Sequence, residues 1–292
     1  MISPSQVKKL LDRHGFQLKR SLGQNFLIDA NILNRIVEGA EIKEDDNVLE
    51  VGPGIGSLTR ALARVCAKVV AVEIDRALFP ILDETLKDYD NAYIIHGDIL
   101  KIDLGKIMTE YFEGEPFKVV ANLPYYITSP ILMTFLESDL PYEDITVMVQ
   151  SEVADRIMAT PGTKDYGLLT VAINYYAEVF FIAKVPPSVF MPRPKVSSQV
   201  IKLVRKADHM LDKSAEELFF QVIKAAFSKR RKTLLNALSS YPSIKKIGDK
   251  VYIREILGKA NIDPARRGET LDYEEFACIA QILRQHLSPY DI

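Results

Sequence analysis

Short apolar runs alternate with segments of helical periodicity through the first two-thirds of the chain. A short helix should end near Gly15, and a second one should begin after Asp29, a residue type that caps helices well. Further helices are expected to open at Ser57, Asp75 and Ser129. Seven apolar runs predict strands at 48–51, 69–73, 92–96, 117–121, 145–149, 179–185 and 199–204. Such alternation is typical of an α/β fold with a mostly parallel sheet.

The end of the chain departs from this pattern. A proline-rich link joins the last two predicted strands and is too short for a helical crossover, so the last strand should be antiparallel. Beyond residue 204, helical periodicity covers 215–227, 229–238, 251–257 and 271–286. We therefore predict an α/β domain over residues 1–205 and a small all-helical domain over residues 206–292.

Composition narrows the class of protein. Of the 292 residues, 48% are hydrophobic and 26% charged, which excludes wholesale disorder. No apolar run approaches the ~20 residues that span a bilayer, and residues 1–15 lack the apolar core of a signal peptide. Cys66 and Cys278 lie too far apart for a CxxC pair, and the four histidines are scattered. We expect a cytoplasmic protein with neither a bound metal nor a membrane partner.

The net charge of −2 conceals an uneven distribution of charge. Residues 1–25 hold five basic and one acidic side chain, and residues 202–259 hold 14 basic and six acidic ones. The intervening residues 26–201 hold 15 basic and 26 acidic side chains. An acidic body between a basic N-terminal segment (1–28) and a basic C-terminal segment indicates a polyanionic partner.

A glycine-rich loop from Glu50 to Gly56 follows the first long strand and precedes a helix. Glycine permits φ > 0 and a close approach to a ligand, although a tight strand-to-helix turn would explain the same residues. The third glycine falls one position early for the GxGxxG dinucleotide fingerprint. The spacing, with Gly52 and Gly54, is similar to the [DE]xGxGxG loop of S-adenosylmethionine-dependent methyltransferases with a doubly wound sheet.

Two acidic residues, Glu73 and Asp98, follow the next two strands. The carboxyl ends of parallel strands share one edge of a sheet, where open α/β folds bind ligands. Glu73 could accept hydrogen bonds from both hydroxyls of a ribose, and in methyltransferases of this kind the aspartate binds the adenine amino group of the cofactor. Each acid alone could be a solvated strand-end carboxylate. Three correctly ordered strand ends favour a cofactor site.

Asn122, Leu123, Pro124 and Tyr125 directly follow the fourth long strand. An exocyclic aromatic amine is a poor nucleophile because its lone pair is delocalised into the ring. The Asn122 side-chain oxygen and the Leu123 carbonyl could accept its two N–H bonds and favour a pyramidal nitrogen, while Pro124 stiffens the turn. Tyr125 could stack on a base removed from its own stack. The alternative is an ordinary proline turn with a buried tyrosine.

On these residues, the chain resembles the ribosomal RNA adenine N6-dimethyltransferase family over nearly its whole length. The resemblance implies a Rossmann-like methyltransferase domain with S-adenosylmethionine as methyl donor, and cofactor contacts from Asn25 and Leu27 in the segment 22–29. The remaining matched cofactor positions are Gly52, Glu73, Asp98 and Asn122. Phe190 lies in a stretch that looks like the family's substrate-facing loop, where its ring would cover the second face of the target base. A core plug between two antiparallel strands is an equal alternative for Phe190.

Two C-terminal stretches, 225–234 and 263–271, are similar to the small-subunit branch of this family. Members of that branch dimethylate two adjacent adenosines in a hairpin near the 3′ end of small-subunit (16S) ribosomal RNA. The resemblance therefore implies a role in small-subunit biogenesis, with this RNA or a 30S pre-ribosomal particle as partner; we expect a monomer. Three rivals remain: a large-subunit methyltransferase of the macrolide-resistance type, a nicotinamide oxidoreductase, and a non-catalytic assembly or RNA-binding factor.

Four successive cations open the predicted helix 229–238: Lys229, Arg230, Arg231 and Lys232. Neighbours on a helix lie ~100° apart, so these side chains could not all share one face, and a solvated helix start is the plain alternative. Together with the other basic residues of segment 202–259, they predict a surface that tracks RNA phosphates.

Overall fold

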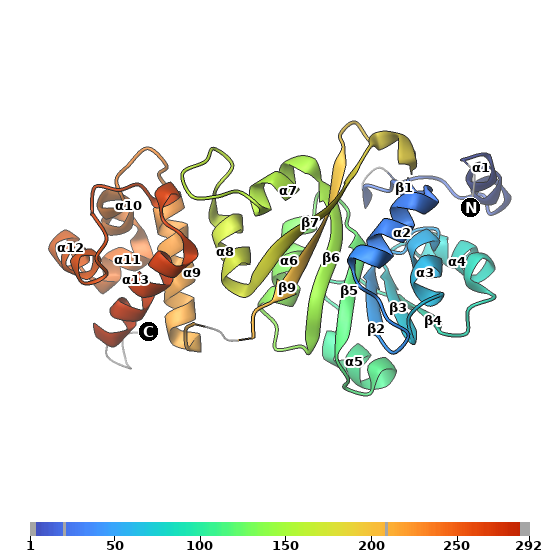
Figure 1. The fold of residues 1–292 in the computed structure, drawn as a ribbon, viewed down its shortest axis with the longest axis horizontal. Coiled ribbons are helices and arrows are strands. Elements are labelled where there is room, and N and C mark those ends of the chain that lie inside the picture. Colours follow the sequence, from blue (N-terminus) through green and yellow to red (C-terminus); the bar gives the residue numbers. More distant parts are fainter. Residues whose placement is uncertain (1–3, 20–21, 208–209, 287–292) are drawn as a thin grey trace. The chain divides into compact units, whose positions relative to one another are not determined.

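In the computed structural model, residues 4–19, 22–207 and 210–286 are described, so parts of the predicted basic segment 1–28 (residues 1–3 and 20–21) lie outside them. The chain divides into two compact units. An α/β unit comprises residues 1–154 and 178–205, and a helical unit comprises residues 155–177 and 206–292. The sheet and the separate group of helices are seen in Figure 1.

A seven-stranded sheet forms the centre of the α/β unit, in the order β4-β3-β2-β5-β6-β9-β7. Its strands are β2 (Asn47–Val51), β3 (Lys68–Glu73), β4 (Ala92–His96), β5 (Phe117–Asn122), β6 (Tyr142–Gln150), β7 (Ala177–Val185) and β9 (Ser198–Arg205). The pairs from β4 to β6 are parallel, whereas β9 runs antiparallel to β6. The predicted fold class is confirmed. Strand order reverses direction around β2, so the crevice for a ligand should open beside the carboxyl end of that strand.

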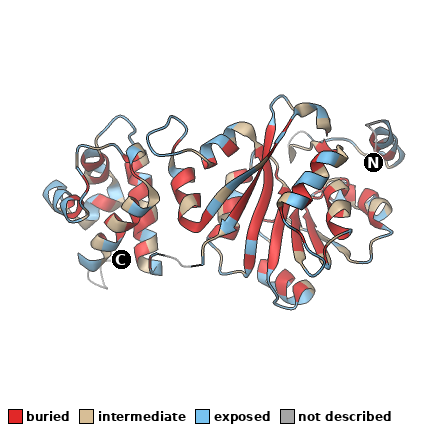
Figure 2. Ribbon diagram, in the orientation of Figure 1, coloured by how far each residue is buried: buried red, intermediate tan, exposed pale blue. Residues whose placement is uncertain are grey.

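Helices bury the sheet, whose strands are mostly buried in Figure 2. Helices α2 (Ala30–Gly39) and α3 (Ser57–Ala63) cover one face, where Ile36 and Leu62 pack with strand residues such as Val48. The Asp29 carboxylate caps α2 by accepting the N–H groups of residues 31 and 32, as predicted. A second cluster joins α1 (Pro4–Arg13) to α4 (Phe79–Leu86). The other helices here are α5 (Leu104–Phe112), α6 (Thr128–Leu136) and α7 (Ser151–Ile157), which straddles the unit boundary.

The helical unit contains α8 (Leu168–Tyr176), α9 (Lys213–Phe227), α10 (Leu234–Ser240), α11 (Pro242–Ile247), α12 (Lys250–Lys259) and α13 (Tyr273–His286). The predicted boundary near 205 coincides with the end of β9, but residues 155–177 also belong to this unit. The reason is aromatic packing: the rings of Tyr175 and Phe219 have centroids 4.6 Å apart, which joins α8 to α9. None of the described helices is long and apolar enough to cross a membrane.

The structure differs from the predicted elements in several places. Strands β1 (Phe26–Leu27) and β8 (Phe190–Met191) form a separate antiparallel pair that the sequence did not indicate. Helix α10 begins only after its cap, Thr233, so the predicted helix start at residue 229 is wrong and residues 229–232 form a turn. Ser57 is the first residue of α3 rather than its cap, since the capping position is Gly56 at φ +81°.

Candidate active site

The glycine loop forms the floor of a pocket at the carboxyl edge of the sheet. Gly52, Gly54 and Gly56 all have positive φ, which side chains at these positions would strain. A Cβ atom added to Gly52 would meet nothing within 4 Å, so this position faces open space, whereas one on Gly54 would lie 2.9 Å from the Phe26 ring. The loop thus presents bare backbone to a ligand while packing closely against the N-terminal segment.

Two carboxyl groups lie beneath this loop. Glu73 accepts hydrogen bonds from the N–H groups of Gly54 at 3.3 Å and Asp75 at 2.7 Å, and burial raises its pKa. Glu50 is only 1% exposed, and burial, with the Glu73 charge nearby, raises its pKa to about 8. Its Oε2 atom has no hydrogen-bond partner among the described residues. A buried carboxyl group with one unpartnered oxygen, on a pocket wall, is suited to a cationic or hydrogen-bonding ligand.

Asp98 lies on the same pocket wall, one strand farther along the sheet. Its carboxylate is about one-quarter exposed, accepts the N–H of Leu100, and pairs with Lys101 at 3.3 Å. The pocket is also lined by the other cofactor positions expected from the sequence, which are Asn25, Leu27, Gly52, Gly54, Glu73 and Asn122. The structure therefore brings all seven predicted cofactor positions together around one pocket.

The turn after β5 supplies the next wall of the pocket. Asn122 ends the strand, and its Nδ2 donates to the backbone carbonyl of Asn25 at 3.2 Å. This bond fixes the amide and leaves its Oδ1 without a hydrogen bond within the described part of the chain. The Leu123 N–H donates to the carbonyl of Met148, which anchors the turn on β6, and the Thr128 hydroxyl donates to the carbonyl of Pro124.

Tyr125 is partly buried in this wall, and its hydroxyl lies 2.9 Å from the hydroxyl of Ser198 at the start of β9. Burial raises the pKa of Tyr125, so the phenol stays protonated near neutral pH. The ring therefore offers an uncharged, anchored aromatic surface beside Asn122, as a base-stacking role requires. In the described part of the chain, no group of three His, Cys, Asp or Glu side chains is arranged to hold a metal.

The N-terminal segment closes the pocket through contacts that the sequence did not reveal. Asp75, 3% exposed, accepts hydrogen bonds from the Lys19 ammonium at 2.7 Å and the Gln24 amide at 2.9 Å. Burial alone would raise the pKa of Asp75, but these hydrogen bonds hold it below its ordinary value. No local sequence pattern indicates these contacts, because Asp75 lies 56 positions from Lys19 and 51 positions from Gln24. The only hint in the sequence is a second acidic residue just after Glu73.

Phe190 lies in the core rather than in the pocket. Its side chain is 4% exposed, pairs across from Leu27 in the two-stranded sheet, and joins the apolar cluster under α2. It is absent from the pocket lining. Of the two interpretations offered by the sequence, burial favours the core plug, and a contact with substrate stays a prediction.

The four successive cations are exposed on the turn between α9 and α10, within the helical unit. Two of them have partners: Lys229 donates to the Ser240 hydroxyl, and Arg230 donates to the Lys164 carbonyl at 2.8 Å and pairs with Glu269 at 3.4 Å. Arg231 and Lys232 make no ion pair or side-chain hydrogen bond to the rest of the described chain. Lys229 and Arg230 therefore bind neighbouring segments, whereas Arg231 and Lys232 are available to a ligand.

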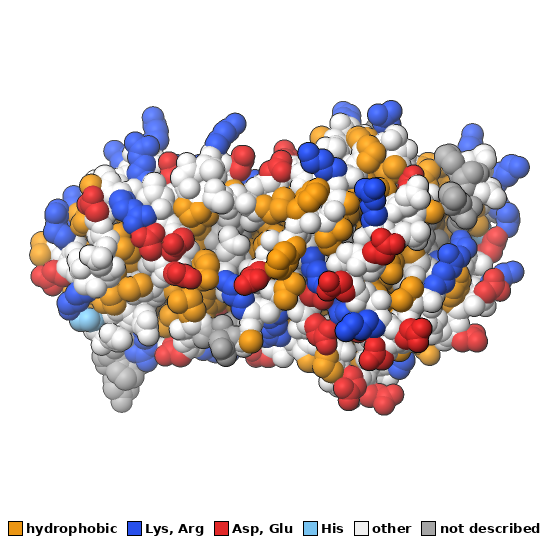
Figure 3. Space-filling view, in the orientation of Figure 1, with side chains coloured by type: hydrophobic (Ala, Val, Ile, Leu, Met, Phe, Trp, Pro, Cys, Tyr) orange, Lys and Arg blue, Asp and Glu red, His pale blue; other side chains and the backbone are white. Residues whose placement is uncertain are grey.

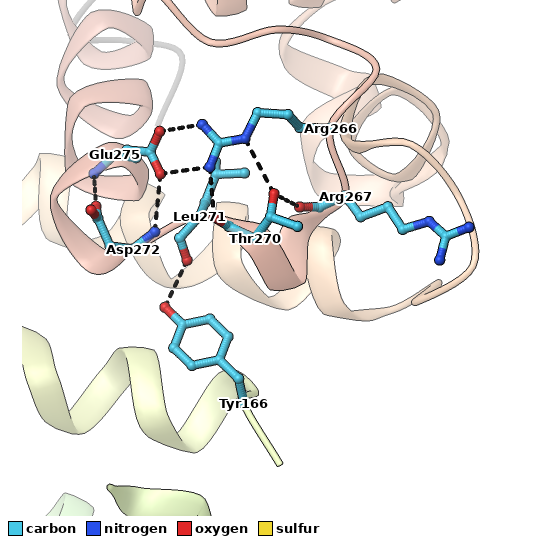
Figure 4. A network of polar contacts seen from close by, with 7 residues as sticks. All are labelled: Tyr166, Arg266, Arg267, Thr270, Leu271, Asp272 and Glu275. Carbon is cyan, nitrogen blue, oxygen red and sulfur yellow. Dashed lines mark hydrogen bonds and ion pairs between the residues drawn. The ribbon is translucent and has the colours of Figure 1, made fainter. Parts of the chain in front are cut away.

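A second turn, residues 263–271, contacts this cation run through the ion pair between Glu269 and Arg230. Figure 4 shows the network of polar contacts that holds this turn. Arg266 forms a bidentate ion pair with Glu275 and also bonds Thr270, while Gly268 packs so closely on Ala226 that a Cβ atom would lie 2.8 Å from it. Arg267 points away from this network and is exposed. Lys and Arg side chains project from this part of the helical unit in Figure 3.

The fold and the pocket together define the class of protein. A switch-point pocket with a [DE]xGxGxG loop, ordered strand-end acids and an Asn-Leu-Pro-Tyr turn is that of a Rossmann-like methyltransferase. The family model for ribosomal RNA adenine dimethylase matches residues 15–278. The chain belongs to the ribosomal RNA adenine dimethylase family.

Known relatives and solved structures agree with this assignment. The chain is 51% identical to ribosomal RNA small subunit methyltransferase A of Alkaliphilus metalliredigens, covering 96% of this chain and 97% of that protein. It is 50% identical to the protein of the same name from Clostridioides difficile, over 98% of each chain. The crystal structure of a dimethyladenosine transferase from Plasmodium falciparum superposes with a TM-score of 0.75 at 26% identity, covering 89% of this chain and 98% of that one. The 23S rRNA methyltransferase ErmE gives 0.67 at 31% identity, covering 89% of this chain and 100% of the other.

Proposed function

We propose that this protein dimethylates the N6 amines of two adjacent adenosines in small-subunit ribosomal RNA, using S-adenosylmethionine. Relatives named for the small-subunit reaction match along almost the whole chain, including both C-terminal stretches on which the sequence resemblance rests. The observation that supports the chemistry is the orientation of the Asn122 amide. Its NH₂ group donates to the Asn25 carbonyl, which leaves the amide oxygen available to a ligand in the pocket.

The pocket fits S-adenosylmethionine, which supplies an activated methyl group when bound. The open face at Gly52 admits a ligand directly against the backbone, and the carboxyl groups of Glu50 and Glu73 suit a positively charged one. Glu73 and Asp98 stand at neighbouring strand ends, where they would bind ribose and adenine groups in that order. Asn25 and Leu27 would complete the wall from the N-terminal segment. No metal ion is needed for this chemistry.

The side chains at the turn after β5 would activate the target amine. The Asn122 oxygen and the Leu123 carbonyl accept hydrogen bonds from the two N–H groups of the adenine amine. These hydrogen bonds withdraw the nitrogen lone pair from the aromatic ring and direct the lone pair at the methyl donor. Tyr125 stacks on the adenine after it has left its own stack. A proton must then leave the methylated nitrogen, and water in the open pocket suffices to accept it.

RNA contacts are proposed for the free cations of the helical unit. Arg231 and Lys232, with Arg267 on the neighbouring turn, present positive charge without an acidic partner, and phosphates are the natural counterions. Lys229 and Arg230 contribute charge as well, although Arg230 also holds the loop at residue 164. Phe190 would contact substrate only after leaving its core position. We propose that the enzyme acts as a cytoplasmic monomer on a 30S pre-ribosomal particle.

The rivals differ from this proposal in testable ways. A large-subunit methyltransferase shares the chemistry but not the target RNA, and a nicotinamide oxidoreductase would require a different loop spacing. A non-catalytic assembly role could coexist with the enzyme. Labelled cofactor is supplied with small-subunit particles or with large-subunit RNA, and the modified nucleotides are mapped. The position of the methyl groups distinguishes the proposed small-subunit enzyme from a large-subunit methyltransferase, and an oxidoreductase would transfer none.

The mechanism is tested by Asn122→Ala. We expect loss of methyl transfer by at least about 100-fold, since the truncated side chain no longer accepts an amine N–H, while RNA binding in a gel-shift assay stays near that of the wild type. Asn236→Ala, on the exposed side of α10, is a matched control that should keep full activity. Full activity in Asn122→Ala would show that another group activates the amine.

A further inference from the structure

A second tyrosine stands at the mouth of the pocket. Tyr126 follows Tyr125 directly, lines the same pocket, and is 55% exposed, which makes it the most exposed aromatic side chain of the described chain. Its hydroxyl makes no hydrogen bond with described residues. A single exposed ring is common on a protein surface, so what singles out Tyr126 is its position beside Tyr125 at the same pocket.

The two adjacent rings are held by different parts of the fold. Tyr125 is anchored by Ser198 on β9, whereas the ring of Tyr126 packs on Gly23 of the N-terminal segment. A Cβ atom added to Gly23 would lie 3.5 Å from Cδ1 and 3.6 Å from Cε1 of Tyr126. Gly23 has φ +61°, and its carbonyl accepts the Asn25 amide at 2.9 Å. Tyr126 is therefore a supported ring with one side free, rather than a loose one.

The proposed substrate raises a need that this ring meets. Two adjacent bases must be handled at one pocket, but Asn122 and Tyr125 account for only the base that receives the methyl group. Phe190, the other aromatic candidate from the sequence, is 4% exposed and lies outside the pocket lining. Tyr126 is the exposed aromatic surface that adjoins Tyr125.

We propose that Tyr126 stacks on the nucleobase next to the target adenine and so fixes the strand for methylation of adjacent adenosines. Stacking uses the face of the base, so the neighbour can be held whether or not its amine already carries methyl groups. This role rests on the proposed function and extends it to the choice of RNA. Tyr126 would determine specificity and would not act on the amine itself.

The test combines changes in protein and RNA. Wild type, Tyr126→Leu and Tyr126→Phe are assayed on a hairpin RNA with two adjacent adenosines, and on the same RNA with an abasic nucleotide beside the remaining target. Base–aromatic stacking is worth ~1–3 kcal/mol, which converts to roughly 5- to 150-fold in kcat/KM at 1.4 kcal/mol per tenfold. We expect Tyr126→Leu and the abasic RNA each to cause such a loss, mainly through KM for RNA, and the two losses not to add. Tyr126→Phe should retain activity and all four methyl groups per RNA.

Binding measurements complete the test. A fluorescent base analogue beside the target should be quenched on binding to the wild type and not on binding to Tyr126→Leu, while Tyr93→Leu, a half-exposed tyrosine on β4, should behave as the wild type. Additive losses, an equal loss in Tyr126→Phe, or a loss that parallels weaker S-adenosylmethionine binding in calorimetry would overturn the proposal. Failure of the wild type to methylate the intact RNA would instead overturn the proposed function.

Discussion

At the scale of single residues, the site depends on polar atoms that are buried or fixed before any ligand arrives. The Asn122 amide is oriented by a backbone carbonyl from residue 25, and the Glu50 carboxyl group is enclosed without a partner for one oxygen. The arrangement at Glu50 has a cost in the free protein that a ligand can offset, because an unpaired buried polar atom loses its hydration without replacement.

The pKa of Glu50 leads to a prediction about stability and pH. Because its pKa is about 8 in the folded protein and near the ordinary 4.5 when unfolded, the folded state binds the extra proton between these values. The stability of the ligand-free protein should therefore fall as pH rises from about 5 to 8. Glu50→Gln should remove much of this fall and raise the melting temperature at pH 8 by several degrees, since 1 kcal/mol shifts it by about 2–4 °C.

Scanning calorimetry at pH 5 and pH 8 measures the effect. Glu44→Gln, an exposed acid after α2, serves as the control and should leave the difference between the two pH values unchanged. If Glu50→Gln lowered the melting temperature equally at both pH values, the carboxyl group would be stabilised in its charged form.

At the scale of secondary-structure elements, the N-terminal segment is attached to the rest of the α/β unit at three places. These are the Asp75 hydrogen bonds to Lys19 and Gln24, the bond between Asn25 and Asn122, and the β1–β8 strand pair. Each tie lies beside a predicted cofactor position. The segment thus forms one wall of the pocket, and its attachment should control how firmly the cofactor is bound.

Asp75→Ala tests this attachment. It removes the acceptor for Lys19 and Gln24, and we expect S-adenosylmethionine binding measured by calorimetry to weaken by about tenfold, equivalent to ~1.4 kcal/mol. Glu84→Ala is the matched control: it removes the partner of Arg13 and His14 in the same segment, away from the pocket lining. Equal weakening in both variants would mean that overall attachment matters rather than the wall itself.

The elements that the sequence predicted and those that it did not differ in how they are stabilised. All seven long strands were predicted because each is a continuous apolar run, with ends within three residues of those observed. Strands β1 and β8 have two residues each and exist only through pairing across more than 160 positions, which leaves no local pattern. Likewise, the cofactor positions proposed from the sequence after β2 to β5 followed from strand ends in order, while Asn25 and Leu27 came only from the family resemblance. The roles of Tyr126, Gly23 and Asp75 depend on contacts between distant segments.

At the scale of the whole molecule, acidic and basic residues are concentrated in different regions of the sequence. The net charge of −2 does not reveal this distribution. The acidic body contains most of the pocket that we propose for a positively charged cofactor, while the helical unit presents free cations on its turns. Sequence alone located the cation run, but the structure shows that only part of it is unpaired, because Arg230 and Lys229 bind neighbouring segments.

The difference between paired and unpaired cations leads to a prediction about the salt dependence of RNA binding. Replacing both Arg231 and Lys232 by Ala should reduce the slope of log K against log salt by about 1.4–1.8, since each lost phosphate contact contributes ~0.7–0.9. Filter binding over a range of KCl concentrations measures the slope. Lys245→Ala with Lys246→Ala, an exposed pair at the end of α11 with the same charge change, should alter it less. Equal slopes for the two double variants would indicate diffuse attraction.

The β1–β8 strand pair also has a consequence for synthesis of the chain. The glycine loop and the acids and asparagine at the strand ends are all translated by residue 122, yet β1 has no strand to pair with until residues 190–191 emerge. A nascent chain therefore carries most of its proposed cofactor positions well before the third attachment of the N-terminal wall, the β1–β8 pair, can form. Vectorial translation delays a finished pocket until nearly two-thirds of the polypeptide has left the ribosome.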